Sequence, residues 1–267
     1  MENTLIINRL KLAQDYTELL DREGYHLVDM NMVEPFYIED KEHHPSTIIF
    51  ERNEQLMSIR SDWTRSLLNY NENFHLSHRM FGYFGPVVRG YETFYQAGVE
   101  LYGPEEAEIL KSIDMHLSFF KNKTPDNFRA VVVNNDKLLD LYVEKYSLDI
   151  SIKDLIYEKN ISEIRKNLGE DHPLTILMTA KVSDQIDIIN NEFQNSEELD
   201  FINHLRHHLA EYNMKFILDL SFRSPQSYYN GFYFQVFLNH DYPLISGGEY
   251  NSSAFGIAVN LSNGGLL

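Results

Sequence analysis

Two consecutive stretches of the chain predict a β-hairpin that is apolar on one face and polar on the other. The first is Tyr83-Phe-Gly-Pro-Val-Val-Arg89, and the second, Gln96-Ala-Gly-Val-Glu-Leu-Tyr-Gly103, begins after a short connection. Side chains alternate between the two sides of a strand, so the second stretch would turn Gln96, Gly98 and Glu100 one way and its apolar residues the other. A tight hairpin would also bring Arg89 close to this polar stripe. One face is therefore expected to pack and the other to bind.

The composition limits the partners of the chain. At 267 residues, 43% of them hydrophobic, the chain is long enough to bury a sizeable core. Its 23 basic and 40 acidic residues give a formal net charge of -17, which repels nucleic acid in the absence of a basic patch. It has no cysteine, so disulfides and thiolate chemistry are excluded. The start does not resemble a signal peptide, and no apolar run approaches about 20 residues, so we expect a soluble, cytoplasmic protein with no membrane partner.

Hydrophobic periodicity in the first half of the chain predicts helices and strands in an order typical of an α+β protein. An amphipathic helix is expected from residue 3 to residue 22, and Gly24 would end it. Pro104 and the acidic residues after it favour a second helix, with an apolar stripe from Ile109 to Phe120. Between the two helices, strand patterns occur at 47–50, 56–59, 80–88 and 93–102.

The second half of the chain resumes the sheet after a mostly helical block. A short strand is predicted at 128–134, helices at 136–146, 151–167 and 183–212, and strands at 216–222 and 228–238. No repeat, low-complexity tract or flexible linker marks a second module. We therefore expect one domain over residues 1–267, built as an antiparallel sheet flanked by helices, with a mostly helical insertion at about 104–213.

A cation, an amide and a carboxylate converge on the predicted binding face. Arg89 could take the carboxylate of an amino acid in a bidentate pair, with Gln96 as a neighbouring amide. Asp62 or Glu100 could hold an ammonium group or an imidazole N–H. These residue types suit an amino-acid ligand. They would equally suit a buried Arg–Glu pair that satisfies itself and binds nothing, and the residue types alone leave both readings open.

Two further groups of side chains invite a functional interpretation. The last predicted strand is rich in aromatic residues, most of which we expect in the core, with Tyr228 and Tyr229 as the candidates for ligand contact. His204, His207 and His208 are spaced along one helix face, which favours a solvated surface over a metal site because no carboxylate motif accompanies them. The sequence contains no phosphate-binding glycine loop, nucleophile elbow or zinc signature, so neither a metal nor a cofactor is expected.

Four segments of the chain resemble, in order, motifs of the histidyl-tRNA synthetase family. The predicted hairpin is similar to motif 2 and its return strand, Phe-Gly-Pro-Val-x-Arg and then Gln-x-Gly-x-Glu-x-x-Gly. Upstream, Ile59-Arg-Ser-Asp-Trp-Thr64 resembles the segment Leu-Arg-Pro-(Asp/Glu)-x-Thr. Downstream, Ser227-Tyr-Tyr-Asn-Gly-Phe-Tyr-Phe-Gln235 resembles the histidine-pocket strand Tyr-Tyr-x-Gly-x-x-Phe-Glu, and Gly247-Gly-Glu-Tyr-Asn251 resembles Gly-Gly-Arg-Tyr-Asp. The resemblance implies a core like that of class II aminoacyl-tRNA synthetases.

The same resemblance implies a histidine-like pocket and no catalytic residues. The pocket positions that it implies are Asp62, Thr64, Arg89, Gln96, Glu100, Tyr228 and Tyr229. The motif 2 pattern Arg-x-Glu, in contrast, is here Arg89-Gly90-Tyr91, and the Glu-Arg of motif 3 is Asn260-Leu261. The arginine segment before the two tyrosines is replaced by Ser224-Pro-Gln-Ser227, with Arg223 one place away. Adenylation needs fixed cations around the reacting phosphate, so these departures argue against that chemistry.

The resemblance therefore points to the non-catalytic branch of the family, the regulatory subunits of ATP phosphoribosyltransferase. Such a chain would assemble with a short-form catalytic subunit for the first step of histidine biosynthesis and help to transmit feedback inhibition by histidine. Leu267 closely follows the motif 3 match, so no anticodon-binding domain is expected. Gly24-Tyr-His-Leu-Val-Asp29 resembles the start of motif 1, through which we expect a homodimer within a hetero-oligomer. Two alternatives stay open, a stand-alone amino-acid-activating ligase and a histidine sensor without a catalytic partner.

Overall fold

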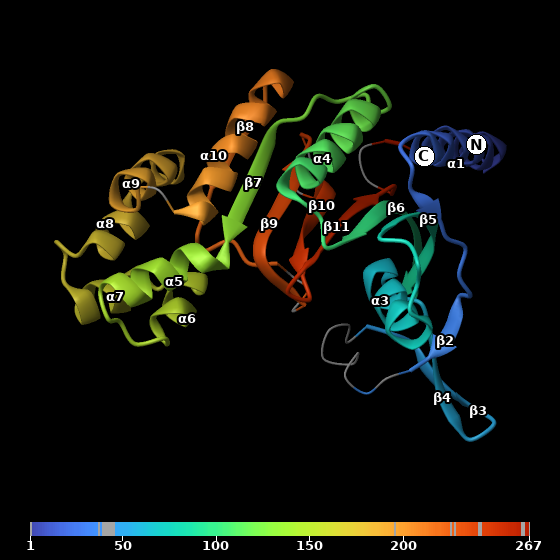
Figure 1. Cartoon of the computed structure of the whole chain (residues 1–267), viewed down its shortest axis with the longest axis horizontal. Coiled ribbons are helices and arrows are strands. Elements are labelled where there is room, and N and C mark those ends of the chain that lie inside the picture. The colour runs from blue at the N-terminus through green and yellow to red at the C-terminus, as the bar shows by residue number, and fades with distance from the viewer. Residues whose placement is uncertain are drawn as a thin grey trace.

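An eight-stranded mixed sheet forms the centre of the computed structural model, which describes residues 2–36, 38, 46–194, 196–224, 226, 228–239, 242–262 and 265–266 (Figure 1). In spatial order the strands are β1 (His26–Leu27), β5 (Met80–Arg89), β6 (Glu92–Tyr102), β11 (Ala254–Asn260), β10 (Pro243–Tyr250), β9 (Tyr229–Phe237), β7 (Ala130–Asn135) and β8 (Lys215–Leu218). Neighbours are antiparallel, except that β1 is parallel to β5 and β7 is parallel to β8.

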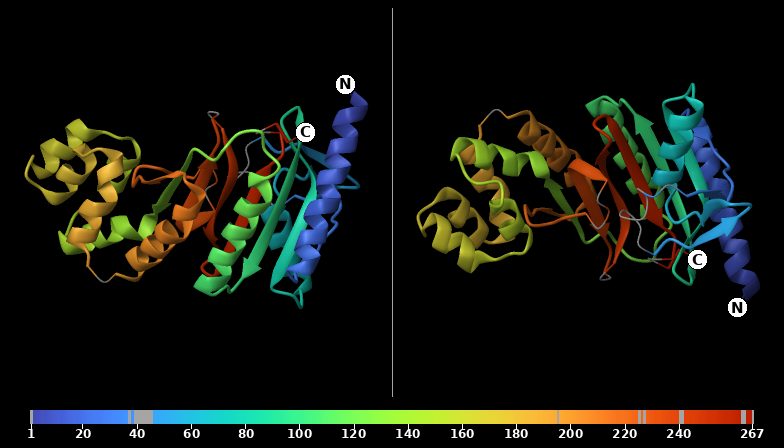
Figure 2. Two further views of the ribbon diagram at one scale, coloured as in Figure 1. Left: turned by 90° about the horizontal axis from the view of Figure 1, so that it is seen from above. Right: turned by 90° about the horizontal axis from the view of Figure 1, so that it is seen from below.

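The predicted hairpin is present as β5 and β6, and its two faces are covered differently. The strands pair with Gly85 opposite Gln96, so the polar stripe of β6 shares a face with the odd-numbered residues of β5. Helices α1 (Glu2–Arg22) and α4 (Glu106–Lys121) cover the apolar face, where Val99 is fully buried (Figure 2). Helix α3 (Trp63–Phe74) covers the polar face, where Trp63 stacks on Tyr83 with ring centroids 4.8 Å apart.

The strand predicted at 216–222 is shorter in the structure, because β8 ends at Leu218. The side chain of Asp219 accepts a hydrogen bond from the Ser221 backbone N–H at 2.9 Å, and the Phe222 N–H donates to the Asp219 carbonyl at 2.9 Å. These local bonds turn the chain out of the sheet. Leu220 is nevertheless fully buried, which explains why the apolar alternation continues beyond the strand.

The segment between β7 and β8 is helical, and most of it gathers at one end of the molecule (Figure 1). The helix predicted at 151–167 is two helices, because Lys159 has a φ of 54° and the side chain of Asn160 caps the second by accepting from the Glu163 N–H. The elements are α5 (Asp136–Lys145), α6 (Ile152–Tyr157), α7 (Ile161–Leu168), α8 (Pro173–Thr179), η1 (Val182–Asp184), α9 (Gln185–Glu192), α10 (Glu197–Leu209) and η2 (Ala210–Tyr212).

A small three-stranded sheet stands at the other end, formed by β2 (Val33–Pro35), β4 (Gln55–Ile59) and β3 (Ile49–Arg52) (Figure 1). Arg60 follows β4, and its buried guanidinium lies over the Trp63 ring at 3.6 Å. The guanidinium also donates to the carbonyl oxygens of Met30 and Pro86, which ties the start of α3 to β5. In the described part of the chain, no helix combines the length and apolar character needed to cross a membrane.

A buried polar contact joins α1 to α4 on the apolar face. The Tyr16 hydroxyl lies 2.8 Å from His116 Nε2, and His116 Nδ1 lies 2.7 Å from the Ser112 carbonyl oxygen. A carbonyl only accepts, so Nδ1 carries the proton and Nε2 accepts from the tyrosine. Burial lowers the pKa of His116 to about 4, so the imidazole stays neutral.

We expect the stability advantage of the wild type over His116→Gln to shrink as the pH falls from about 6.5 to about 4. In this window the unfolded imidazole takes up a proton and the folded one does not, so unfolding binds a proton. The unfolding free energy of the wild type should fall, relative to the variant, by about 1.4 kcal/mol for each pH unit. Denaturant melts across this range measure the difference, and a difference that does not change with pH would contradict the assignment.

Candidate ligand-binding site

A cavity of about 180 Å³ lies on the polar face of the sheet, beside the start of α3. Five of the residues predicted from the sequence line it, namely Asp62, Arg89, Gln96, Tyr228 and Tyr229. The other two, Thr64 and Glu100, are buried and do not line it. Elements far apart in the sequence, from the α3 cap to β9, thus meet at one place.

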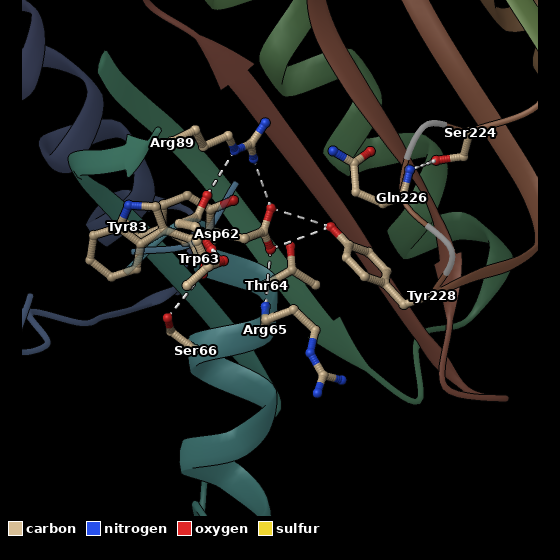
Figure 3. A network of polar contacts seen from close by, with 12 residues as sticks. Asp62, Trp63, Thr64, Arg65, Ser66, Tyr83, Arg89, Ser224, Gln226 and Tyr228 are labelled. Carbon is tan, nitrogen blue, oxygen red and sulfur yellow. Dashed lines mark hydrogen bonds and ion pairs between the residues drawn. The ribbon is translucent and has the colours of Figure 1, made fainter. Parts of the chain in front are cut away.

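Asp62 is held by three donors at the edge of this cavity (Figure 3). As the N-cap of α3, it accepts from the Arg65 backbone N–H at 3.1 Å. Arg89 Nη2 pairs with it at 3.2 Å, and the Tyr228 hydroxyl lies 3.3 Å from Oδ1 and 3.4 Å from Oδ2. Arg89 is fixed in turn, because its Nε donates to the Ser61 carbonyl oxygen at 2.9 Å. The site therefore presents a carboxylate and a guanidinium side by side, as the two ends of a free amino acid require.

Glu100 lies fully buried on β6, inside a cluster of hydroxyl donors. Thr64 Oγ1 donates to Oε1 at 2.6 Å, and the Tyr250 hydroxyl donates to Oε2 at 2.8 Å. Burial raises the pKa of Glu100 to about 8, although these two hydrogen bonds act in the opposite direction. Sequence reasoning did not single out Tyr250, although it belongs to the segment that resembles Gly-Gly-Arg-Tyr-Asp.

Glycines on the neighbouring strands make room for these side chains. A Cβ on Gly256 would lie 2.2 Å from Glu100 Oε2, and one on Gly248 would lie 2.9 Å from Cδ1 of Tyr229. Both glycines lie in the row of β-sheet partners that contains Glu100. The Glu100 carboxyl and the Tyr229 ring therefore pack directly against the strand backbone at these two glycines. A residue with a Cβ at either position would clash with them.

Gln96, a residue that lines the cavity, has a buried amide oxygen without a hydrogen-bond partner among the described residues. The side chain of Gln96 is 7% exposed, and the unpaired atom is Oε1. A buried amide oxygen without a donor is costly, and an ammonium or other N–H group would satisfy it. The arrangement is suited to a small zwitterion.

The reading in which Arg89 and Glu100 form a self-satisfied pair is wrong. Arg89 pairs with Asp62, and the oxygens of Glu100 are taken by hydroxyl groups. The reason is geometric, because Arg89 is at the end of β5, opposite Glu92, whereas Glu100 is opposite Phe81 near the other end.

The sequence profile of the histidyl-tRNA synthetase family matches residues 7–263. The chain belongs to this family. Regulatory subunits of ATP phosphoribosyltransferase from Staphylococcus aureus strains Newman and JH1 are 25% identical to it, over 98% of this chain and 100% of theirs. The similarity is therefore end to end.

Solved structures of the family share the fold. A protein from Bacillus halodurans C, described as an ATP phosphoribosyltransferase regulatory subunit/histidyl-tRNA synthetase, has a TM-score of 0.75 at 18% identity, covering 96% of this chain and 78% of its own. A chain of the ATP phosphoribosyl transferase complex from Thermotoga maritima has a TM-score of 0.76 at 15% identity, covering 95% and 97%. The histidyl-tRNA synthetase of Nostoc sp. PCC 7120 has a TM-score of 0.69 at 16% identity, covering 97% and 72%. The predicted class II synthetase-like α+β fold is confirmed.

Some positions of this histidyl-tRNA synthetase family member depart from the family motifs. Among the described residues, these positions add no second cation to the cavity. Asn260 lines the cavity, and Leu261, where motif 3 has arginine, is fully buried. Arg223 lies over the Tyr157 ring at 5.0 Å, away from this cavity. Among the described residues that line the site, Arg89 is the one cation, and its guanidinium already forms an ion pair with Asp62.

The three histidines of α10 lie on a helix surface. His204 Nδ1 is 2.8 Å from Glu106 Oε1, and His208 Nε2 is 3.5 Å from Asp114 Oδ1. No cluster of three metal-ligating side chains occurs in the described ranges. The contacts are those of a helix face that packs beside α4.

We expect Glu100→Gln to gain stability over the wild type as the pH rises from about 4.5 to about 8. In this window the folded Glu100 keeps a proton that the unfolded carboxyl has lost, so unfolding of the wild type releases a proton. The wild type should lose about 1.4 kcal/mol of unfolding free energy relative to the variant for each pH unit. Denaturant melts at pH 5, 6, 7 and 8 measure this difference, and parallel curves would show that Glu100 is not held protonated.

Proposed function

We propose that the chain is the regulatory subunit of an ATP phosphoribosyltransferase. It acts with a separate short-form catalytic subunit in the first step of histidine biosynthesis and has no catalysis of its own. The end-to-end similarity to regulatory subunits supports this role over that of a tRNA ligase. The observation that carries the proposal is a site with groups for an amino acid in which Arg89, already paired with Asp62, is the one cation among the described lining residues.

We also propose that histidine is the ligand of the cavity and biases the assembly between active and inhibited states. The ligand carboxylate would take Arg89 from Asp62, and its ammonium group would bind Asp62 and the free oxygen of Gln96. Tyr228 and Tyr229 would enclose the side chain, and Thr64 would hold Glu100 behind them. Because the ligand replaces an existing ion pair, no bare charge is left buried in either state.

A homodimer within the hetero-oligomer fits the apolar surface of α1. The N-terminal half of this helix projects past the sheet (Figure 2). Its exposed apolar residues are Leu5, Ile6, Ile7 and Leu10, whose exposed fractions are 43%, 45%, 49% and 63%. Ile6 and Ile7 lie four and three residues before Leu10 and so are its neighbours on the helix surface, and exposed apolar side chains grouped in this way are typical of a protein–protein contact. We place the protein in the cytoplasm, beside the catalytic subunit, and assign it no nucleic-acid partner because of its charge of -17.

We expect phosphoribosyl-ATP formation by a short-form catalytic subunit to depend on this chain. The assay compares the catalytic subunit alone, the two chains together, and the pair with histidine added. Activity should rise when both chains are present and fall when histidine is added. An unchanged rate in all three mixtures would contradict the proposal.

The variant Arg89→Ala is expected to make the assembled complex at least 10-fold less sensitive to histidine, because a charged hydrogen-bond partner of the ligand is lost, a loss worth about 1.5–3 kcal/mol. Arg79→Ala is the matched control, since Arg79 is exposed, pairs with Glu108 and does not line the cavity. Assembly of both variants is checked by co-elution with the catalytic subunit. If Arg89→Ala assembles and is inhibited as strongly as the control, histidine does not bind at this cavity.

We expect no exchange of pyrophosphate into ATP when the chain is mixed with ATP and histidine. A single cation that already pairs with a carboxylate cannot stabilise the charge that develops on a reacting phosphate. Radiolabelled exchange is the measurement, with a histidyl-tRNA synthetase as the positive control. Exchange above the background would favour the amino-acid-activating ligase instead.

A further inference from the structure

The ligand cavity has a second group of polar side chains, apart from Asp62 and Arg89. Gln235 of β9 and Ser246 of β10 line it, and both are only partly buried, so neither is shut off from a ligand. In the sheet, β6 and β11 lie between the strand of Arg89 and that of Ser246, so the two groups stand on different sides of the cavity. An amino acid whose charged ends meet Asp62 and Arg89 would therefore extend its side chain toward Gln235 and Ser246.

Gln235 and Ser246 form one hydrogen-bonded unit. They are direct partners in the antiparallel pairing of β9 with β10, and Gln235 Nε2 donates to Ser246 Oγ at 3.2 Å. On the other side of Ser246, the partner in β11 is Ala258, a small residue that also lines the cavity. A carboxamide and a hydroxyl can each donate and accept hydrogen bonds, and neither carries a charge. The pair therefore suits a side chain that is polar but neutral.

No carboxylate is left over for a cationic side chain. Asp62 pairs with Arg89, and in the proposed complex it holds the ammonium group of the ligand. Glu100 is fully buried, does not line the cavity, and accepts hydrogen bonds from Thr64 and Tyr250. Asp62 is thus the one carboxylate among the described residues that line the site.

The sequence marks Gln235 as a departure from the family pattern. In the segment that resembles Tyr-Tyr-x-Gly-x-x-Phe-Glu, Gln235 stands at the position of the glutamate. Glutamine keeps the oxygen acceptor of glutamate and lacks its charge. A cationic side chain that enters such a wall loses its water and finds no counterion, which is costly.

From these contacts we infer that Gln235, together with Ser246, restricts the cavity to amino acids whose side chain is uncharged and carries a hydrogen-bonding N–H or O–H group. This inference rests on the proposed amino-acid ligand. Histidine with a neutral imidazole meets the requirement, because its ring N–H donates to the Gln235 carboxamide oxygen and its other ring nitrogen accepts from the Ser246 hydroxyl. Side chains like that of lysine are excluded by their charge.

The test compares the binding of histidine and of ornithine to the full chain, by calorimetric titration at pH 7.5. At this pH most imidazole is neutral, because the ring titrates near 6.5, whereas the side chain of ornithine is an ammonium group like that of lysine, which titrates near 10.4. The wild type should bind ornithine at least about 10-fold more weakly than histidine. In Gln235→Glu this ratio should fall by about 10-fold, because the new carboxylate pairs with the ammonium group.

Two further variants complete the comparison. Gln55→Glu is the matched control, because Gln55 is exposed on β4, does not line the cavity, and adds the same charge to the chain. Ser246→Asp supplies a carboxylate to the same part of the cavity from β10, so it should lower the ratio in the same way and serves as the test if Gln235→Glu does not fold. Thermal melts show which variants are folded.

The possible results separate this inference from the proposed ligand. Equal binding of histidine and ornithine by the wild type, or an unchanged ratio in the cavity variants, would overturn the inference while histidine remains the ligand. A ratio that falls as far in Gln55→Glu as in Gln235→Glu would assign the effect to net charge and would overturn it too. Heat from neither ligand would contradict both the inference and the proposed histidine site. The titration needs no catalytic subunit.

Discussion

The buried carboxyl of Glu100 is the contact on which the arrangement of the site depends. A group of this kind is tolerated in a dry interior only when donors surround it, and the donors here come from α3, through Thr64, and from β10, through Tyr250. Room for it exists because Gly256 presents bare backbone on the adjacent strand. The contact fixes α3 against the sheet, and Asp62, the cap of that helix, is thereby held at the edge of the cavity.

The site carries groups suited to an amino acid and, among the described residues that line it, no cation other than the paired Arg89. Asp62, at the cap of α3, and Arg89, at the end of β5, form an ion pair at the cavity, so a zwitterion that enters would meet groups of both charges. The same sheet brings Asn260 and Leu261 to the position where the family's motif 3 supplies glutamate and arginine. A phosphate that reacts at this place would find no free cation among the described lining residues, whereas an amino acid would find partners for both of its ends. The proposed regulatory role, and not that of a ligase, rests on this difference.

Much of the fold could be predicted from the sequence. The apolar residues of β6 are spaced as in a strand and those of α4 as in a helix, because both sets are buried in one core. The prediction failed where local bonds compete with the pattern, as at Asp219, which turns the chain while Leu220 is still buried. For the site, the resemblance to family motifs named five residues that line the cavity, but it could not indicate that Arg89 pairs with Asp62 and not with Glu100. That choice depends on the strand register, which places Arg89 at one end of β5 and Phe81, opposite Glu100, near the other. The hydrogen bond from Asn134 to the Phe222 carbonyl oxygen joins segments 88 residues apart, which no local pattern encodes.

The central claim is that the cavity at Asp62 and Arg89 still binds histidine, although the chemistry of the family has been lost from it. A crystal structure of the chain grown with histidine tests this claim most directly. The account predicts histidine in the cavity, with its carboxylate on Arg89 and its ammonium group on Asp62 and Gln96, and with Glu100 still bonded to Thr64 and Tyr250. An empty cavity with the ion pair of Asp62 and Arg89 intact, at histidine concentrations that inhibit the assembled enzyme, would contradict it.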